Sequence, residues 1–371
     1  MTALRRTDPV DDSGTTTRLL EVEDLTVRLP TRDGHRNAVD GVSFGIDRGA
    51  ILGLAGESGS GKTMTAMAML GLLPHGARTG GSIRLDGSEL RTTSQRGLRA
   101  VRGRRIALIS QDPATSLHPM LSVGTQLTEH MRHHLGLSKD AARARAIELL
   151  NTVRIPNPEQ ALKSHPGVFS GGMRQRIAIA SALACDPDVL LADEPTTALD
   201  VTVQAGILRL LDRLRRERGL AVLLITHDLG VLSAVADEVC VMYGGRIVER
   251  GRRRDVLGRP GHPYTRALLD ALPHPETPNS ALRPIPGSPP PLGAVPDGCA
   301  FAPRCSLRIA ACVEQRPKLA VPSSERPGAA VQNPSIVHAA IGGDPIAPDV
   351  IAGGSVAHEA ACLVIAPAGA V

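Results

Sequence analysis

Apolar and polar positions form recognisable blocks along the first part of the chain, and each block predicts an element. Residues 19–30 (LLEVEDLTVRLP) alternate apolar and polar side chains, which is typical of a half-buried strand. Residues 38–49 (AVDGVSFGIDRG) are expected to pair with it. Residues 50–56 (AILGLAG) predict a buried strand that runs into a glycine-rich loop, after which TMTAMAMLGLL continues as an apolar helix.

A second group of apolar runs follows later in the chain. Strand character returns at residues 189–193, 221–226 and 238–251, with the helical pattern ILRLLDRLRRERG between the first two. Strands that alternate with helices usually form a mainly parallel sheet covered on both faces, so we expect this architecture for the core. Between the two groups, residues from about 112 to 184 carry helical patterning, which predicts an inserted helical subdomain.

The two ends of the chain differ from this core. Residues 1–18 are polar and are expected to form a disordered tail, which leaves residues 19–258 as the core domain. After residue 258 proline and glycine become dense, as in a linker that leads into a small appended module. Residues 259–371 are therefore expected to form a C-terminal extension.

Composition narrows the class of protein. Of the 371 residues, 42% are hydrophobic and 21% are charged, which is enough for a sizeable core. No apolar run approaches the ~20 residues that cross a bilayer, and the first residues lack the apolar stretch of a secretory signal. The net charge is only +5, and two Tyr, three Phe and no Trp do not suggest a nucleic-acid-binding face. We expect a cytoplasmic protein with no membrane span and no nucleic-acid partner.

The segment GESGSGKT carries the first candidate chemistry. Glycines let backbone amides approach an anion without a Cβ in the way, and the helix that follows directs its positive end to the same point. Lys62 would reach the terminal phosphates, and the Thr63 hydroxyl would ligate Mg²⁺. A plain glycine-rich turn is the alternative. The predicted nucleotide-binding residues here are Gly56, Glu57, Ser58, Gly59, Ser60, Gly61, Lys62 and Thr63.

Polar residues also follow two of the predicted strands. Asp193 and Glu194 end the apolar run VLLAD, so we expect them at the carboxyl edge of the sheet, where such folds bind ligands. Phosphate loops use strand-end carboxylates together with Mg²⁺, although a helix-capping acidic pair is the alternative. His227 follows the apolar run AVLLIT, where a lone histidine is more often structural.

The motifs follow one another in an order that resembles a known family. GESGSGKT, SQDPATSLHP, FSGGMRQR, VLLADEPTTALD and LLITHDL occur in that order, and FSGGMRQR resembles the signature of the ATP-binding-cassette (ABC) superfamily. The resemblance covers about residues 19–320. It implies an α/β fold, in which a P-loop (RecA-like) ABC nucleotide-binding domain has an antiparallel β subdomain and a helical subdomain, with a small cysteine-containing extension. It also implies ATP hydrolysis with Mg²⁺.

The resemblance assigns roles to the polar residues that follow strands. Asp193 would hold Mg²⁺ through water, and Glu194 would polarise the attacking water. His227 in LLITHDL is similar to the family's switch histidine, which contacts the γ-phosphate. Gln111 in SQDPATSLHP resembles the glutamine that senses Mg²⁺ and the attacking water and couples the ATPase to membrane subunits. A surface loop is the alternative for Gln111.

The signature implies a partner subunit. Ser170, Gly171 and Gly172 open a helix, and an amide-rich helix start suits an anion. In the family this motif closes over the ATP of a partner, so that two subunits hold two ATP molecules head to tail, and Asp200 is similar to the residue that crosses the same interface. Met173 stands where the commonest signature has glutamine, and this variant resembles the peptide and nickel importer branch.

This branch sets the functional expectation. The segment GHPYTRALLDALP (residues 261–273) is also similar to the sequence that follows the peptide-importer core. We expect the ATP-hydrolysing subunit of a bacterial ABC importer of di- and oligopeptides, at the cytoplasmic face of the membrane. Its expected partners are a second ATPase subunit, preferably a sister subunit, two transmembrane permease subunits and an extracellular substrate-binding protein.

Three alternatives remain open. The first is an importer of nickel or another small solute. The second is a soluble ABC ATPase of DNA repair or translation, although those proteins usually carry two cassettes, coiled coils or zinc inserts. The third is an iron-sulfur redox sensor with a vestigial ATPase, against which the intact Lys62, Asp193, Glu194 and His227 argue.

One position departs from the family pattern. The family usually stacks the adenine on an aromatic residue just before the second strand, whereas residues 31–37 (TRDGHRN) offer only His35 or Arg36. This departure predicts loose adenine recognition.

Four of the six cysteines lie in the extension. Cys299, Cys305 and Cys312 form a C-x5-C-x6-C pattern, and Cys362 follows much later. Four thiolates can close a site for zinc or for an iron-sulfur cluster, and the spacing is wider than in structural zinc pairs. In the peptide-importer branch this region resembles one that holds a 4Fe-4S cluster, so a cluster is the expectation. Zinc and metal-free thiols are the alternatives.

Overall fold

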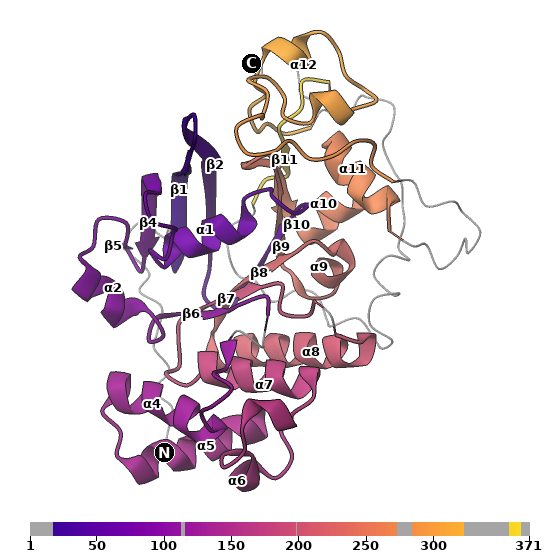
Figure 1. Cartoon of the computed structure of the whole chain (residues 1–371). Helices are drawn as coiled ribbons and strands as arrows, with labels where there is room; N and C mark the ends of the chain where they lie inside the picture. The colour runs from indigo at the N-terminus through magenta and orange to yellow at the C-terminus, as the bar shows by residue number, and fades with distance from the viewer. Residues whose placement is uncertain (1–17, 113–115, 198, 273–283, 323–355, 365–371) are drawn as a thin grey trace, which may run out of the picture.

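The computed structural model describes residues 18–112, 116–197, 199–272, 284–322 and 356–364 (Figure 1). The tail predicted for residues 1–18 lies outside these residues, apart from Arg18. The strands are β1 (Leu20–Thr31), β2 (Gly34–Ile46), β3 (Ile51–Ala55), β4 (Arg78–Leu85), β5 (Ser88–Glu89), β6 (Ile106–Ile109), β7 (Val189–Asp193), β8 (Ala221–Thr226), β9 (Glu238–Tyr243), β10 (Arg246–Arg252) and β11 (Glu359–Ala360). The helices are α1 (Lys62–Met69), α2 (Gln95–Val101), α4 (Val123–Leu135), α5 (Lys139–Thr152), α6 (Pro158–Ala161), α7 (Gly171–Ala182), α8 (Val201–Arg218), α9 (Leu229–Val235), α10 (Arg253–Gly258), α11 (Pro263–Asp270) and α12 (Ala311–Glu314), with 3₁₀ turns η1 (Pro166–Val168) and η2 (Ala302–Arg304).

Two sheets form the framework of the molecule. The larger sheet has the strand order β11-β10-β9-β3-β8-β7-β6, in which the five strands from β9 to β6 are parallel and β10 and β11 are antiparallel. The smaller sheet is antiparallel, with the order β2-β1-β4-β5. Both the predicted pairing of β1 with β2 and the predicted parallel sheet are confirmed.

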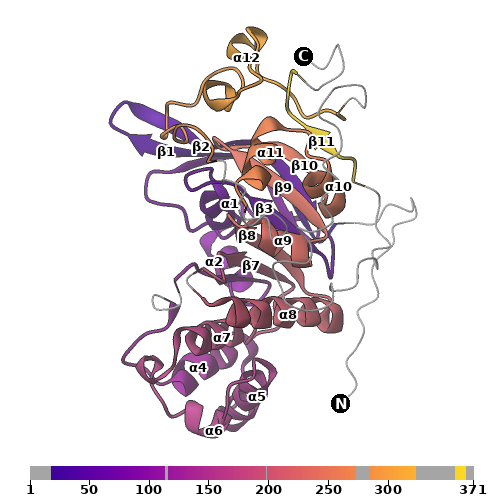
Figure 2. The ribbon, with the colours of Figure 1, turned by 90° about the vertical axis from the view of Figure 1, so that its right-hand side faces the viewer.

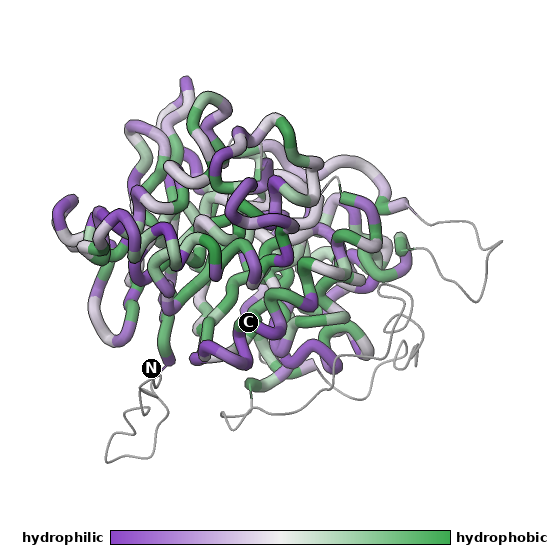
Figure 3. The backbone as a smooth tube through the Cα atoms, turned by 90° about the horizontal axis from the view of Figure 1, so that it is seen from below, coloured by the Kyte–Doolittle hydropathy of each residue, from purple (hydrophilic) through white to green (hydrophobic). Residues whose placement is uncertain are grey.

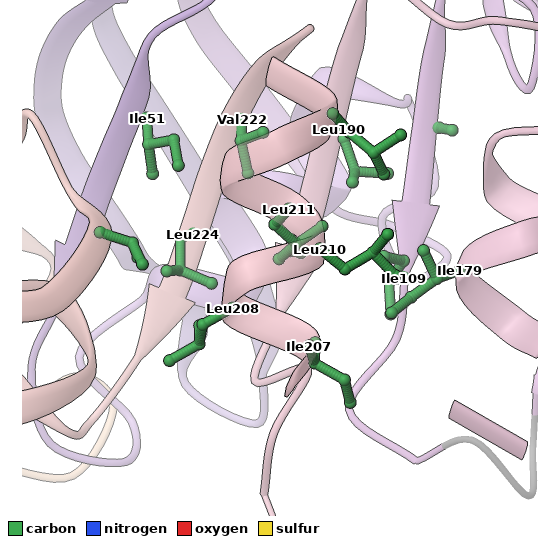
Figure 4. Close-up of a cluster of buried hydrophobic side chains, with 14 of the residues drawn as sticks. Ile51, Ile109, Ile179, Leu190, Ile207, Leu208, Leu210, Leu211, Val222 and Leu224 are labelled. Atoms are coloured by element: carbon green, nitrogen blue, oxygen red, sulfur yellow. The ribbon is translucent and has the colours of Figure 1, made fainter. Parts of the chain in front are cut away.

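The central strands of the larger sheet are buried on both faces. Every residue of β3, β7 and β8 is buried. Along β8, Val222 and Leu224 share one core cluster with Leu211 of α8, which Figure 4 shows lying over the sheet. Leu223 and Ile225 belong to the cluster on the other face, which includes the smaller sheet and α1. Because side chains alternate between the two faces of a strand, a continuous apolar run suits a strand that is covered twice.

Helices α4 to α7 lie together at the end of the molecule opposite the smaller sheet (Figures 1 and 2). They contact one another, and α7 also contacts β6 of the larger sheet. The hydroxyl of Ser122 accepts the N–H of Thr125 at the start of α4, and Ser138 caps α5 in the same way. The helical patterning of this stretch therefore corresponds to helices packed against the sheet.

The C-terminal part of the chain returns to the larger sheet. Strand β11 pairs with β10, with Ala360 opposite Glu249, and so forms the edge of the sheet. Residues 284–322 lie over the β9–β10 side of the sheet in Figure 1. The tube in Figure 3 shows hydrophobic residues concentrated in the interior segments. Among the residues that the structure describes, no helix has the length and apolar character needed to cross a membrane.

The double burial of β8 gives a stability prediction. Leu224→Ala should lower the free energy of unfolding by about 2–5 kcal/mol, because Leu224 is 0% exposed and its truncation leaves a cavity under α8. Leu72→Ala is the control, since this side chain is 48% exposed, and it should cost less than about 1 kcal/mol. Urea unfolding of both variants measures the difference, and equal losses would contradict this description of the core.

Candidate functional site

The glycine-rich loop joins β3 to α1 and fits closely against neighbouring backbone. Gly56 has φ 147° and Gly61 has φ 103°, both in the region that favours glycine. A Cβ at Gly56 would overlap the carbonyl oxygen of Met242, and a Cβ at Gly61 would lie 2.6 Å from the carbonyl oxygen of Ala38. Only glycine therefore suits these two positions. The chain forms the loop that GESGSGKT predicts, directly before the start of a helix.

Lys62 lies inside this loop. Its Nζ donates to the carbonyl oxygens of Gly56 at 2.8 Å and Glu57 at 2.9 Å, and the side chain is buried. Burial lowers the pKa of Lys62, although the charges of Glu194 and Asp193 act in the opposite direction. A buried ammonium group surrounded by carbonyl oxygens at the start of a helix fits a bound phosphate.

Asp193 and Thr63 supply oxygen atoms beside the loop. The Thr63 side chain hydrogen-bonds Asp193, which is 5% exposed at the end of β7. Burial raises the pKa of Asp193, and the neighbouring Glu194 raises it further, while the hydrogen bond from Thr63 and the charge of Lys62 oppose this. A hydroxyl and a carboxylate that already touch each other are the donor types that Mg²⁺ prefers, so these residues fit the predicted ion.

The carboxylate of Glu194 is the centre of a hydrogen-bond network. Gln111 Nε2 donates to Oε2 at 3.0 Å, and Thr197 Oγ1 donates to the same oxygen at 2.9 Å. Nδ1 of His227 lies 3.1 Å from Oε1. These side chains follow β6, β7 and β8, so the sheet brings together Gln111, Glu194 and His227, which lie far apart in the sequence.

The environment of Glu194 favours its charged form. Burial raises the pKa of Glu194, but the hydrogen bonds from His227 and Thr197 outweigh it, and the net pKa lies below its ordinary value. Its φ of 48° is unusual for a residue with a side chain and is held by a backbone hydrogen bond to Ile225 at 2.9 Å. An oriented carboxylate of this kind can accept a hydrogen bond from an attacking water.

The signature residues lie at the starts of two adjacent helices. The Ser170 hydroxyl accepts the N–H of Met173 at the start of α7, and Asp200 accepts the N–H of Val203 at the start of α8. Gly171 is the first residue of α7. A Cβ at Gly172 would lie 2.6 Å from Val203 Cγ1, so a glycine lets the two helix starts pack together. Within one chain, Ser170 and Asp200 act as helix caps.

Sequence reasoning missed three residues of this site. Thr197 could have been found, because a hydroxyl three residues after Glu194 can reach back to it. Tyr264 and Arg304 both bind Glu57 of the phosphate loop, although they lie more than 200 residues away in the sequence. No local sequence signal indicates contacts of that range.

The two adenine candidates, His35 and Arg36, lie at the start of β2, where they pair with residues at the end of β1. The ring of His35 is hydrogen-bonded to the carbonyl oxygen of Gly76 at 3.0 Å. The Arg36 side chain packs against Gly293 of the extension, where an added Cβ would lie 3.0 Å from Arg36 Cγ. These contacts do not supply the aromatic surface that the sequence lacks.

The predicted iron-sulfur site is wrong. Among the described residues, which include all four extension cysteines, no group of three or more His, Cys, Asp or Glu side chains could hold a metal ion. Burial raises the pKa of the Cys299 and Cys305 thiols. Cys299 and Cys305 pack against the hydrophobic core, and Cys312 and Cys362 are buried. The same finding gives no support for zinc at these residues.

Comparisons with known proteins agree with this arrangement. Residues 39–197 match the ABC transporter family, and residues 248–312 match the oligopeptide/dipeptide transporter C-terminal region. The oligopeptide transport ATP-binding protein OppD of Salmonella typhimurium is 47% identical over 79% of this chain and 88% of its own length. The dipeptide transport ATP-binding protein DppD of Bacillus subtilis is 45% identical over 88% of this chain and 98% of its own length. A solved dimeric bacterial ABC transporter cassette has a TM-score of 0.57 and 26% identity, over 63% of this chain and 99% of that chain.

A phosphate loop after the central strand, with carboxylates at the ends of neighbouring parallel strands, defines a P-loop nucleotide-binding protein. The chain belongs to the ABC transporter family, among the ATP-binding proteins of oligopeptide and dipeptide transport. It is an ATPase of that family, and the sequence resemblance is confirmed.

The network around Glu194 predicts its role in hydrolysis. Glu194→Gln should keep ATP affinity but lower ATP hydrolysis by at least about 100-fold, because the amide cannot orient water as the carboxylate does. Steady-state phosphate release by the assembled complex, with ATP binding measured in parallel, tests this. Turnover close to that of the native chain would remove Glu194 from this role. Glu159→Gln, in the short helix α6, is the matched control and should have native turnover.

Proposed function

We propose that this chain is the ATP-hydrolysing subunit that powers a bacterial ABC importer of di- and oligopeptides. The observation that carries the proposal is the Glu194 network beside the buried Lys62, on a chain whose core and C-terminal region both match this family. The match over residues 248–312 favours peptides over nickel and over the soluble ABC ATPases. The domain division into residues 19–258, with a helical subdomain at about 112–184, and an extension at 259–371 belongs to the same proposal.

The residues of the site have different roles in ATP hydrolysis. The loop amides and Lys62 bind and orient the phosphates, which supplies most of the catalysis in phosphoryl transfer. Glu194 accepts a hydrogen bond from the attacking water, and Gln111 and His227 hold its carboxylate in place. Thr63, Asp193 and Gln111 would hold Mg²⁺, which neutralises phosphate charge when bound.

Partner subunits would complete the transporter. Ser170, Gly171, Gly172 and Asp200 would serve the nucleotide of a second ATPase subunit, most simply a sister subunit, in a head-to-tail dimer. A related cassette forms a dimer, which supports this arrangement. Two transmembrane permease subunits and an extracellular substrate-binding protein would complete the importer. The chain would then lie at the cytoplasmic face of the membrane as a peripheral subunit.

The cargo is tested in cells. A strain that carries Lys62→Ala in the chromosomal gene should lose uptake of labelled di- or oligopeptides and keep uptake of nickel, because Lys62 is needed for phosphate binding. A strain with a native gene is the control for expression and growth. Native peptide uptake together with lost nickel uptake would replace the peptide proposal by its alternative.

The partner interface gives a separate prediction. Ser170→Arg should block closure of the ATPase dimer, and so hydrolysis, while the isolated chain keeps its own ATP affinity, because Ser170 would contact only the partner's nucleotide. ATP binding by the isolated variant and hydrolysis by the assembled complex measure the two effects. A large loss of ATP affinity in the isolated variant would show that the signature acts within its own chain.

A further inference from the structure

Glu57, the second residue of the phosphate loop, is held by two residues from the C-terminal part of the chain. Arg304 donates to both of its carboxylate oxygens, with Nη1 at 2.6 Å from Oε2 and Nη2 at 3.1 Å from Oε1. The backbone N–H of Glu57 donates to the Tyr264 hydroxyl at 2.8 Å. Both the side chain and the backbone of this residue are therefore fixed from outside the loop.

Arg304 is itself held on several sides. Its side chain is 6% exposed, its Nε donates to the carbonyl oxygen of Pro286 at 2.7 Å, and its Nη1 also donates to the Tyr243 hydroxyl at 3.2 Å. The hydrogen bond with Glu57 raises the pKa of Arg304, so the guanidinium stays charged. A planar guanidinium that binds a carboxylate through two hydrogen bonds fixes orientation as well as charge.

Aromatic side chains surround this ion pair. The chain has only two Tyr and three Phe, and Tyr243, Tyr264 and Phe301 form one cluster with ring centroids 4.5 to 5.3 Å apart. The Arg304 guanidinium lies 5.8 Å from the ring centroid of Tyr243 and 5.9 Å from that of Phe301. Most of the chain's scarce aromatic surface is thus placed where β9, α11 and the extension meet the loop. Because these rings shield the ion pair from water, the pair stabilises the structure more than an ion pair exposed to solvent would.

The negative charge of Glu57 links its ion pair with Arg304 to the binding of ATP. Nζ of Lys62 donates to the carbonyl oxygen of Glu57, so the two residues are in direct contact within the loop. A carboxylate without a partner at this place would repel the phosphates, and in a partly buried site the repulsion is weakly screened. The Arg304 guanidinium compensates the charge of Glu57 and restrains its side chain.

We propose that Arg304 and Tyr264 are positioning residues of the ATP site, through which the docked C-terminal extension holds the phosphate loop in its binding form by way of Glu57. The inference rests on the proposed function, because ATP is the ligand whose binding it affects. It makes the extension part of the nucleotide site. ATP affinity then depends on whether the segment around Arg304 is docked.

The first test measures binding of Mg·ATP to the full-length chain by isothermal titration calorimetry. Arg304→Ala should weaken binding about tenfold, which is within the usual range for coupling between neighbouring sites. Arg308→Ala, in an exposed arginine of the same segment, is the matched control and should leave affinity unchanged. In the assembled transporter, Arg304→Ala should raise KM for ATP and keep kcat, because Arg304 acts on the loop and not on Glu194.

The second test separates charge compensation from simple packing. Glu57→Gln added to Arg304→Ala removes the carboxylate that has lost its partner, so it should restore most of the ATP affinity. Lost packing alone would leave the double variant as weak as the single one. Native affinity in Arg304→Ala, or no recovery in the double variant, overturns the proposal. Where circular dichroism shows that Arg304→Ala does not fold, Arg304→Lys with and without Glu57→Gln gives the same comparison.

Lys62→Ala distinguishes failure of this inference from failure of the proposed function. Undiminished Mg·ATP binding by Lys62→Ala would overturn the assignment of the ATP site itself. Lost binding in Lys62→Ala, together with native affinity in Arg304→Ala, would overturn only the positioning role of the extension.

Discussion

The carboxyl ends of neighbouring parallel strands line up along one edge of the larger sheet, and the site depends on that alignment. The phosphate loop follows β3, Asp193 ends β7, and His227 follows β8. In the register of the sheet, Asp193 lies opposite Ile225, and Ala55 lies opposite Thr226. These strands are buried on both faces, so a slip of one residue would turn each side chain into the wrong core cluster. Packing on the two faces therefore fixes the geometry of the candidate site.

Much of this arrangement could be predicted from the sequence. Continuous apolar runs such as residues 221–226 predicted buried strands, and residues such as Asp193 that follow them were expected at one edge. The hydrogen bonds of Gln111 and His227 to one carboxylate could not be predicted in the same way. They depend on the order of strands in the sheet, which places β6, β7 and β8 side by side. Local sequence patterns predict where the strands lie along the chain, but they do not predict which strands are adjacent in the sheet.

The extension shows where local patterns fail. Its cysteine spacing suggested a metal site, but spacing records only the order of ligands along the chain, whereas coordination requires side chains that converge on one point. The structure instead buries Cys312 and Cys362 and packs Cys299 and Cys305 against the hydrophobic core, where cysteine behaves as a small hydrophobic residue. The contact of Arg304 with Glu57 could not be predicted from the sequence either, because the two residues are 247 positions apart and belong to no shared motif.

The charged residues in and beside the loop link ligand binding to the stability of the fold. Burial lowers the pKa of Lys62 and raises that of Asp193, so in both cases the protein alone holds the charged form less well than water does. A phosphate beside Lys62 and a cation beside Asp193 would each restore the missing compensation, and binding to the folded chain alone would then stabilise the fold. Glu57 differs from these two residues, because Arg304 of the same chain already balances its charge. The chain therefore compensates the charges of Lys62 and Asp193 only in part, and it pairs the carboxylate of Glu57 with Arg304.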